Sequence, residues 1–144
     1  AGILHDVTKA LTPGEQQALI GRWQLPVTEF ERANPQLLHA KTGAAVARYI
    51  FGESDAVVSA IKYHTTGKPD MTALEKIIYL ADMIEPNRTY PGVDAIREAA
   101  ARDLDAGVLL ALEQTIAFLQ EERAAVCETS IHARDWLLQA RKEL

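Results

Sequence analysis

Helix-start signals recur along this chain, and they constrain its fold more than any other feature of the sequence. Thr12-Pro13-Gly14-Glu15 places a capping threonine, a proline in the first turn and a glutamate at the third helical position. Ser54 and Thr72 stand before two further apolar runs with helical spacing. No alternating run of β-branched residues is bounded by Asn-Gly or Asp-Gly turns, so strands are not expected. The sequence therefore predicts an all-α protein.

Apolar spacing and chain breakers divide the sequence into successive helices. A first helix is expected to end at His5-Asp6 and to begin before Ala1, because the chain opens inside an apolar run. Further helices are expected after Thr12, from Thr28 to Ala33, from Asn34 to about Phe51, from Ser54 through His64, from Thr72 to before Pro86, from near Val93, over 104–119 and from about Thr129. Since neither an internal repeat nor a linker appears, residues 1–144 are predicted to form a single domain.

Composition and charge indicate which partners and which cellular location to expect for this chain. The net charge of −5 argues against nucleic acid or an anionic membrane as the main partner. No apolar run approaches the roughly 20 residues of a membrane-spanning helix, and no signal peptide is visible. A lone cysteine, Cys127, excludes an internal disulfide and predicts a reducing, cytoplasmic location. Residues 1–91 hold 9 Lys and Arg against 10 Asp and Glu, and residues 92–144 hold 6 against 10. If two buried aspartates in the first part are held by metal, the rest of that part is slightly positive, so a small anionic ligand is expected there.

Polar residues at inward-facing positions carry the chemical information in this sequence. Asp82 lies in the apolar stretch 79–84, where a free carboxylate would be costly to bury. His39 and His64 each lie on the apolar face of an expected helix, and His5-Asp6 ends another. Taken singly, each is more often a hydrogen-bonded structural residue. Together they predict a site for a borderline divalent metal such as Fe, Mn, Co or Zn, whose ligands are imidazole and carboxylate.

Four sequence blocks resemble a known family. The block Leu4-His5-Asp6-Val7-Thr8-Lys9 resembles the signature of the HD-domain phosphohydrolases. Three longer blocks, 37–43 (LLHAKTG), 61–67 (IKYHTTG) and 74–88 (LEKIIYLADMIEPNR), resemble the YqeK-type HD proteins, which are bacterial symmetrical diadenosine tetraphosphate hydrolases. The resemblance covers nearly the whole chain and is weakest at residues 11–34 and at the C-terminal tail.

The resemblance implies an HD-domain helical bundle with a metal site at its centre. The ligands it implies are His5, Asp6, His39, His64 and Asp82. Asp6 would bridge two divalent ions, with His5 and Asp82 on one and His39 and His64 on the other. The family has a further histidine well upstream of the His-Asp pair, and this sequence begins four residues before His5. Either the N-terminal helix that carries this histidine is missing from this sequence, which is the expectation, or the metal position shared by His5, Asp6 and Asp82 is incomplete. Iron is the first choice of metal, with Mn, Co or Zn as alternatives, and a hydroxide bridging the ions would attack the phosphoryl group.

The implied activity is cleavage of diadenosine tetraphosphate into two ADP, with Asp6 and Lys9 as catalytic residues. The substrate contacts expected from this resemblance are Lys9, Thr65, Thr66, Gly67 and Arg88. Each has a structural alternative: a solvated helix-end lysine, turn chemistry at 65–67, and an arginine that ties down the loop at 86–91. Two other functions stay open, a phosphatase acting on another nucleotide or deoxynucleotide and a non-catalytic nucleotide-binding module. The proposed partner is a small dinucleoside polyphosphate, and a homodimer is compatible with the sequence.

Overall fold

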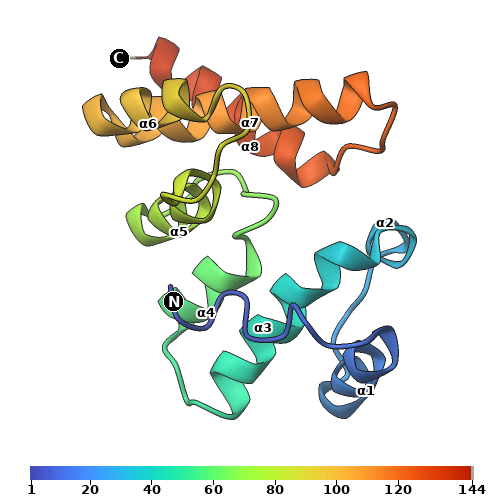
Figure 1. The fold of residues 1–144 in the computed structure, drawn as a ribbon. Coiled ribbons are helices and arrows are strands. Elements are labelled where there is room, and N and C mark those ends of the chain that lie inside the picture. Colours follow the sequence, from blue (N-terminus) through green and yellow to red (C-terminus); the bar gives the residue numbers. More distant parts are fainter. Residues whose placement is uncertain (144) are drawn as a thin grey trace. The chain divides into compact units, whose positions relative to one another are not determined.

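The computed structural model describes residues 1–143, and within this range the chain forms helices and no strands (Figure 1). The elements in chain order are α1 (Pro13–Trp23), α2 (Glu29–Ala33), the 3₁₀ helix η1 (Pro35–Leu37), α3 (Leu38–Tyr49), α4 (Asp55–Lys62), α5 (Ala73–Ile84), α6 (Val93–Arg102), α7 (Leu104–Glu121) and α8 (Glu128–Lys142). The predicted all-α class is confirmed. None of the helices in residues 1–143 is both long and apolar enough to cross a bilayer.

The helix-start signals act as the sequence predicts. The Thr12 hydroxyl accepts a hydrogen bond from the Glu15 amide at 3.2 Å, and the Glu15 carboxylate accepts one from the Thr12 amide at 2.8 Å. Thr72 and Glu75 repeat this reciprocal pair at the start of α5. Each box satisfies amides that the first turn of a helix leaves without a partner.

The prediction of a helix that ends at His5-Asp6 is wrong. Residues 2–10 form successive turns, with short bonds such as Val7 N to the Leu4 carbonyl at 3.1 Å and Lys9 N to the Asp6 carbonyl at 3.0 Å. Such bonds between residues three apart wind the chain more tightly than an α-helix. Thr8 is also held from outside the segment, since its hydroxyl donates to the carbonyl of His39 at 2.9 Å. Long-range anchoring therefore decides the conformation here.

The helix expected to run through His64 ends two residues earlier, at Lys62. The Nδ1 of His64 lies 2.6 Å from the carbonyl oxygen of Ile61. In a continuing helix that oxygen would accept from the backbone amide of residue 65. The imidazole takes this acceptor, and residues 63–66 form a turn.

The described chain divides into two compact units, residues 1–65 and residues 66 onward. In the first unit α3 packs on α4 and α1, around a small core of Ala44, Ala47, Val58 and Ile61. The N-terminal segment passes close to α3 at Gly43, where an added Cβ would lie 3.4 Å from the carbonyl oxygen of His5. Gly43 therefore lets the His-Asp pair approach α3. That residues 1–144 form a single domain stays a prediction.

The second unit consists of α5 to α8, with α7 packed against α5, α6 and α8 (Figure 1). Its core is larger and includes the fully buried Tyr79, Ile96 and Leu112. Helices α6 and α7 approach closely at Gly107, where an added Cβ would lie 2.7 Å from the Cα of Ala100.

Candidate metal centre

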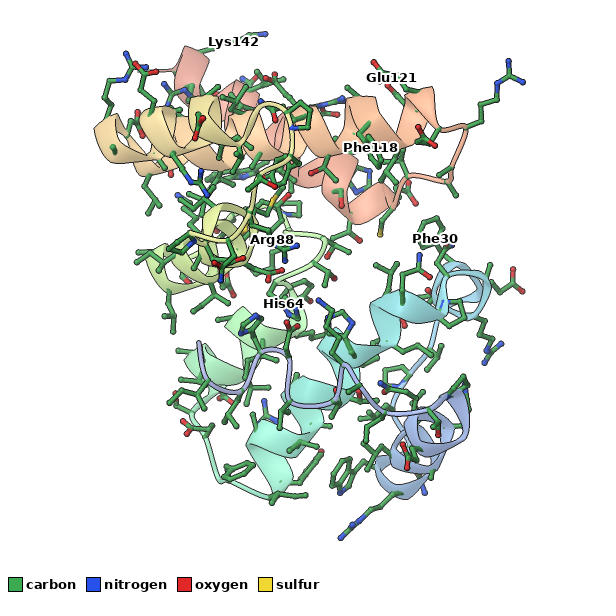
Figure 2. The ribbon with its side chains drawn as sticks, viewed as in Figure 1. Phe30, His64, Arg88, Phe118, Glu121 and Lys142 are labelled. Carbon is green, nitrogen blue, oxygen red and sulfur yellow. The ribbon has the colours of Figure 1, made fainter. Side chains whose placement is uncertain are left out.

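Three imidazoles and one carboxylate meet in the first unit. The N-terminal segment supplies His5 and Asp6, α3 supplies His39, and the turn after α4 supplies His64, which is labelled in Figure 2. The Nε2 atoms of His39 and His64 each lie 3.3 Å from Asp6 Oδ1, and His5 Nε2 lies 3.4 Å from Asp6 Oδ2. Four of the five sequence-predicted metal ligands therefore converge on one point.

Backbone carbonyl groups set the tautomer of all three imidazoles. Each Nδ1 contacts one carbonyl oxygen: that of Gly2 for His5 at 2.7 Å, of Gln36 for His39 at 2.6 Å and of Ile61 for His64 at 2.6 Å. Because a carbonyl oxygen only accepts, each Nδ1 carries the proton, and in a neutral ring Nε2 presents a lone pair. This is the arrangement in which outer-shell partners orient metal-binding histidines.

The contacts at the centre of the cluster need a cation. His39 Nε2 and His64 Nε2 lie 3.2 Å apart, so two lone pairs would face each other between neutral rings. Asp6 Oδ1 is buried and has no hydrogen-bond partner although both nitrogens are near it. Buried acceptors without donors are costly. Imidazole nitrogens and a carboxylate are suitable ligands for Fe, Mn, Co or Zn, so these residues fit a divalent metal.

The charges around the cluster shift two pKa values downward. Burial works to raise the pKa of the Asp6 carboxyl, but the Lys9 ammonium group and the three neighbouring imidazoles together outweigh burial and lower it. Burial lowers the pKa of the His64 imidazole, and the neighbouring His39 acts in the same direction. Both shifts favour the forms that bind metals, an ionised carboxylate and a neutral imidazole.

Buried hydroxyl and amide groups support the cluster from α1 and α3. The Thr8 hydroxyl donates to the His39 carbonyl, and the Thr42 hydroxyl donates to Gln16 Oε1 at 2.6 Å. Gln16 Nε2 in turn donates to the Thr8 carbonyl at 2.7 Å. None of these residues was predicted as a site residue. Thr42 could have been predicted as a supporting residue, because it is a polar residue one turn after His39 on the same apolar helix face.

The expected substrate contacts in the first unit are Lys9 and Thr65. Lys9 Nζ lies 3.5 Å from Asp6 Oδ2, and the lysine side chain is about half exposed. Thr65 is partly buried in the turn that follows α4. Lys9 thus lies next to the cluster with its ammonium group accessible to an anion.

Asp82 and Arg88 form a pair within the second unit. The guanidinium of Arg88 donates through Nε to the Asp82 carbonyl at 3.1 Å and through Nη2 to Asp82 Oδ1 at 3.3 Å. Asp82 is partly buried, so this cation compensates the carboxylate that the sequence placed in an apolar stretch. The role of Asp82 as a metal ligand stays a prediction.

Thr66 and Gly67 have structural contacts in the same unit. The Thr66 carbonyl accepts from Ser130 Oγ at 2.8 Å. Gly67 is buried with a φ of +67°, and an added Cβ would contact Ala133 and Met71 at 3.5 Å. A left-handed backbone conformation favours glycine, so the turn itself requires this residue. Their contact with a substrate stays a prediction.

Arg97, which lies on α6, was also not predicted to have a role. Its guanidinium donates to the carbonyl oxygens of Ile84 at 3.1 Å, Glu85 at 2.8 Å and Arg88 at 2.9 Å. One side chain therefore holds both ends of the segment that follows α5 and carries Arg88. No local pattern signals this role, because the partners lie 9 to 13 residues away in the sequence.

Comparison with protein families and known proteins gives concordant matches. The family model described as "HD domain" matches residues 1–87. The chain is 38% identical over 139 residues to the symmetrical bis(5'-nucleosyl)-tetraphosphatase of Bacillus subtilis, covering 96% of this chain and 74% of that protein. It is 39% identical over 143 residues to the protein of the same name from Halalkalibacterium halodurans, covering 99% and 76%.

A solved structure is also similar along nearly the whole chain. It is a predicted HD superfamily hydrolase involved in NAD metabolism from Clostridium acetobutylicum, with 34% identity and a TM-score of 0.90. The match covers 96% of this chain and 74% of that protein.

Proposed function

This chain belongs to the HD-domain hydrolases, in the family of symmetrical bis(5'-nucleosyl)-tetraphosphatases, and on that premise we propose that it cleaves diadenosine tetraphosphate into two ADP with the help of divalent metal. The resemblance inferred from the sequence blocks is thereby confirmed at the level of the family. The substrate, the products and the metal are proposed in addition to the family membership.

The observation that carries the proposal is the convergence of three Nε2 lone pairs on the Asp6 carboxylate, at 3.3 to 3.4 Å. We propose His5, Asp6, His39 and His64 as metal ligands, with Asp82 as a fifth. Asp6 has oxygens facing different imidazoles, so its carboxylate suits a bridge between two ions. Iron is the proposed metal, with Mn, Co or Zn as alternatives.

The chemistry divides between the bound metal and the protein. Two divalent ions, when bound, supply an activated water near neutral pH and neutralise charge on the phosphoryl oxygens. Lys9 adds a positive charge beside Asp6 and binds a phosphate oxygen. Arg88 keeps an accessible guanidinium face while its Nε and Nη2 hold Asp82, and the exposed face binds phosphate. Asp6 and Lys9 are thus the residues proposed to contact the reacting groups.

The proposed setting is a reducing, cytoplasmic one, in agreement with the single cysteine Cys127. The proposed partner is the small dinucleotide, and the net charge of −5 argues against nucleic acid.

The test is hydrolysis by metal-stripped protein to which Fe, Mn, Co or Zn is returned singly. Metal-dependent ADP as the only product from diadenosine tetraphosphate would support the proposal. ATP and AMP together would reject the symmetrical cut. Bound metal without cleavage would favour another nucleotide substrate, and neither binding nor cleavage would favour a non-catalytic module.

A further inference from the structure

A cavity of about 470 Å³ opens beside the histidine cluster in the first unit. Its wall includes His39, whose Nε2 faces Asp6, and Lys9, whose ammonium group lies near the same carboxylate. Small-molecule sites in proteins typically have volumes of about 300–1,000 Å³. The cavity therefore has a suitable size for a ligand that also reaches the cluster.

The charge of the cavity wall is positive. Lys9 and Arg32 line it, and no acidic residue does. Within residues 1–143 the Arg32 guanidinium has no ion-pair partner. The preceding residue, Glu31, is engaged elsewhere, with its carboxylate 2.7 Å from Lys41 Nζ. Arg32 is therefore available for an anion, and guanidinium groups bind phosphate in a bidentate manner.

The remaining wall combines apolar surface with side-chain amides. Leu11 and Pro35 contribute apolar surface. Gln36 has an exposed side chain with no hydrogen bond among the described residues, while its backbone carbonyl binds His39 Nδ1. Apolar surface with an amide able to donate and accept suits a nucleobase.

We infer that this cavity binds one nucleoside diphosphate half of the substrate, with phosphates between Lys9 and Arg32 and the base beside Gln36. The identity of the ligand rests on the proposed function, but the site is defined by the cavity and its charges. Since the two products are the same nucleotide, the inference also assigns the cavity as a product site, at which ADP inhibits the enzyme.

The experiment measures binding of ADP and of pyrophosphate to the metal-loaded protein and to variants. Arg32→Gln is expected to weaken ADP binding by about tenfold, the loss of one charge-assisted contact. Arg32→Lys keeps the charge and should retain most of the binding. Gln36→Ala should weaken ADP binding and leave pyrophosphate binding unchanged, because pyrophosphate has no base. The matched control is Arg22→Gln, on α1 in the same unit, where the arginine lies over Trp23 outside the cavity wall.

The outcomes separate this inference from the proposed function. Equal ADP affinity in Arg32→Gln, Arg22→Gln and the parent would overturn the cavity site, even where the parent hydrolyses diadenosine tetraphosphate. The same holds if the parent does not bind ADP. ADP binding that depends on Arg32 in a protein that leaves diadenosine tetraphosphate intact would support the cavity and reject the proposed substrate. Circular dichroism of each variant shows that it has folded.

Discussion

Arg97 Nη2 donates to the backbone carbonyl of Arg88 at 2.9 Å, so one arginine fixes the main chain of another. The same guanidinium holds the carbonyls of Ile84 and Glu85. Arg88 in turn holds Asp82 through two hydrogen bonds. The position of the Asp82 carboxylate is thus determined by a chain of contacts that begins on α6.

Arg97→Lys should lower both stability and activity. A lysine presents one ammonium group and cannot satisfy three carbonyls in the geometry of a guanidinium, so partly buried acceptors lose a donor. The loss of a typical hydrogen bond costs about 0.5–1.5 kcal/mol. We expect a lower Tm, together with a larger loss in hydrolysis than the stability change explains at 25 °C. Arg102→Lys is the control, because that residue on α6 is exposed and forms an ion pair with Glu98. An unchanged Tm and activity in Arg97→Lys would contradict the anchoring role.

Thr42→Val should destabilise the first unit. Thr42 is fully buried and its hydroxyl binds Gln16, so the isosteric valine leaves the Gln16 amide oxygen without its donor. We expect a loss of about 1–3 kcal/mol in the free energy of unfolding, measured by denaturant titration. Thr42→Ser keeps the hydroxyl and should lose less. A loss in Thr42→Ser with no loss in Thr42→Val would show that the methyl group matters and the hydrogen bond does not.

Asp6→Asn should remove metal binding and hydrolysis while leaving the helices intact. The amide has no negative charge to offset the cation, and it replaces one of the two acceptor oxygens with a donor facing lone pairs. Changes to outer-shell groups cost about 10–100-fold in metal affinity or activity, so loss of this ligand should cost more than about 100-fold. Metal content and hydrolysis rate are the measurements. Asp70→Asn, at an exposed turn, is the matched control, and full activity in Asp6→Asn would reject the metal centre.

Arg88→Ala should raise KM more than it lowers metal content. The guanidinium is partly exposed, so its removal takes away a phosphate contact, and it also removes two hydrogen bonds to Asp82. Measuring kcat and KM separately identifies the interaction that is lost. A variant with a lower Tm and unchanged kinetics would assign Arg88 to tying down the loop, the structural alternative. Loss of metal together with activity would instead show that Arg88 positions Asp82.

The sequence predicted features that depend on near neighbours. Capping at Thr12 and Thr72 is a contact between residues three apart, so it is visible in the order of residues. The histidine and aspartate ligands could be assigned because their types are chemically distinctive. The conformation of residues 2–10 could not be predicted, since it depends on the bond from Thr8 to the distant His39 carbonyl. The role of Arg97 could not be predicted for the same reason. Its three carbonyl acceptors are distant from it in the sequence, and tertiary packing brings them to its guanidinium.

The stability contributed by Asp103 should depend on pH. This residue caps α7 by accepting from the amides of Asp105 and Ala106, and its other carboxylate oxygen lies 2.8 Å from Arg141 Nη1 on α8. The hydrogen bond from Arg141 and the backbone amides lower the pKa of the Asp103 carboxyl below its usual 3.8. The ionised form is therefore the one that the fold favours. Its contribution is complete above the unfolded-state pKa, and it is lost as the pH falls through the lower folded-state value.

Asp103→Ala should accordingly lower the free energy of unfolding by about 1 kcal/mol at pH 7, the usual cost of losing an N-cap. The difference from the parent should shrink as the pH falls below about 4, because the carboxyl of the unfolded chain is protonated there and the folded one follows at lower pH. Denaturant titrations of both proteins from pH 7 to pH 3 measure it. Asp55→Ala is the control, since that aspartate at the start of α4 is almost fully exposed and forms an ion pair with Arg48. A difference that stays constant over this range would assign the effect of Asp103 to helix propensity and not to its charge.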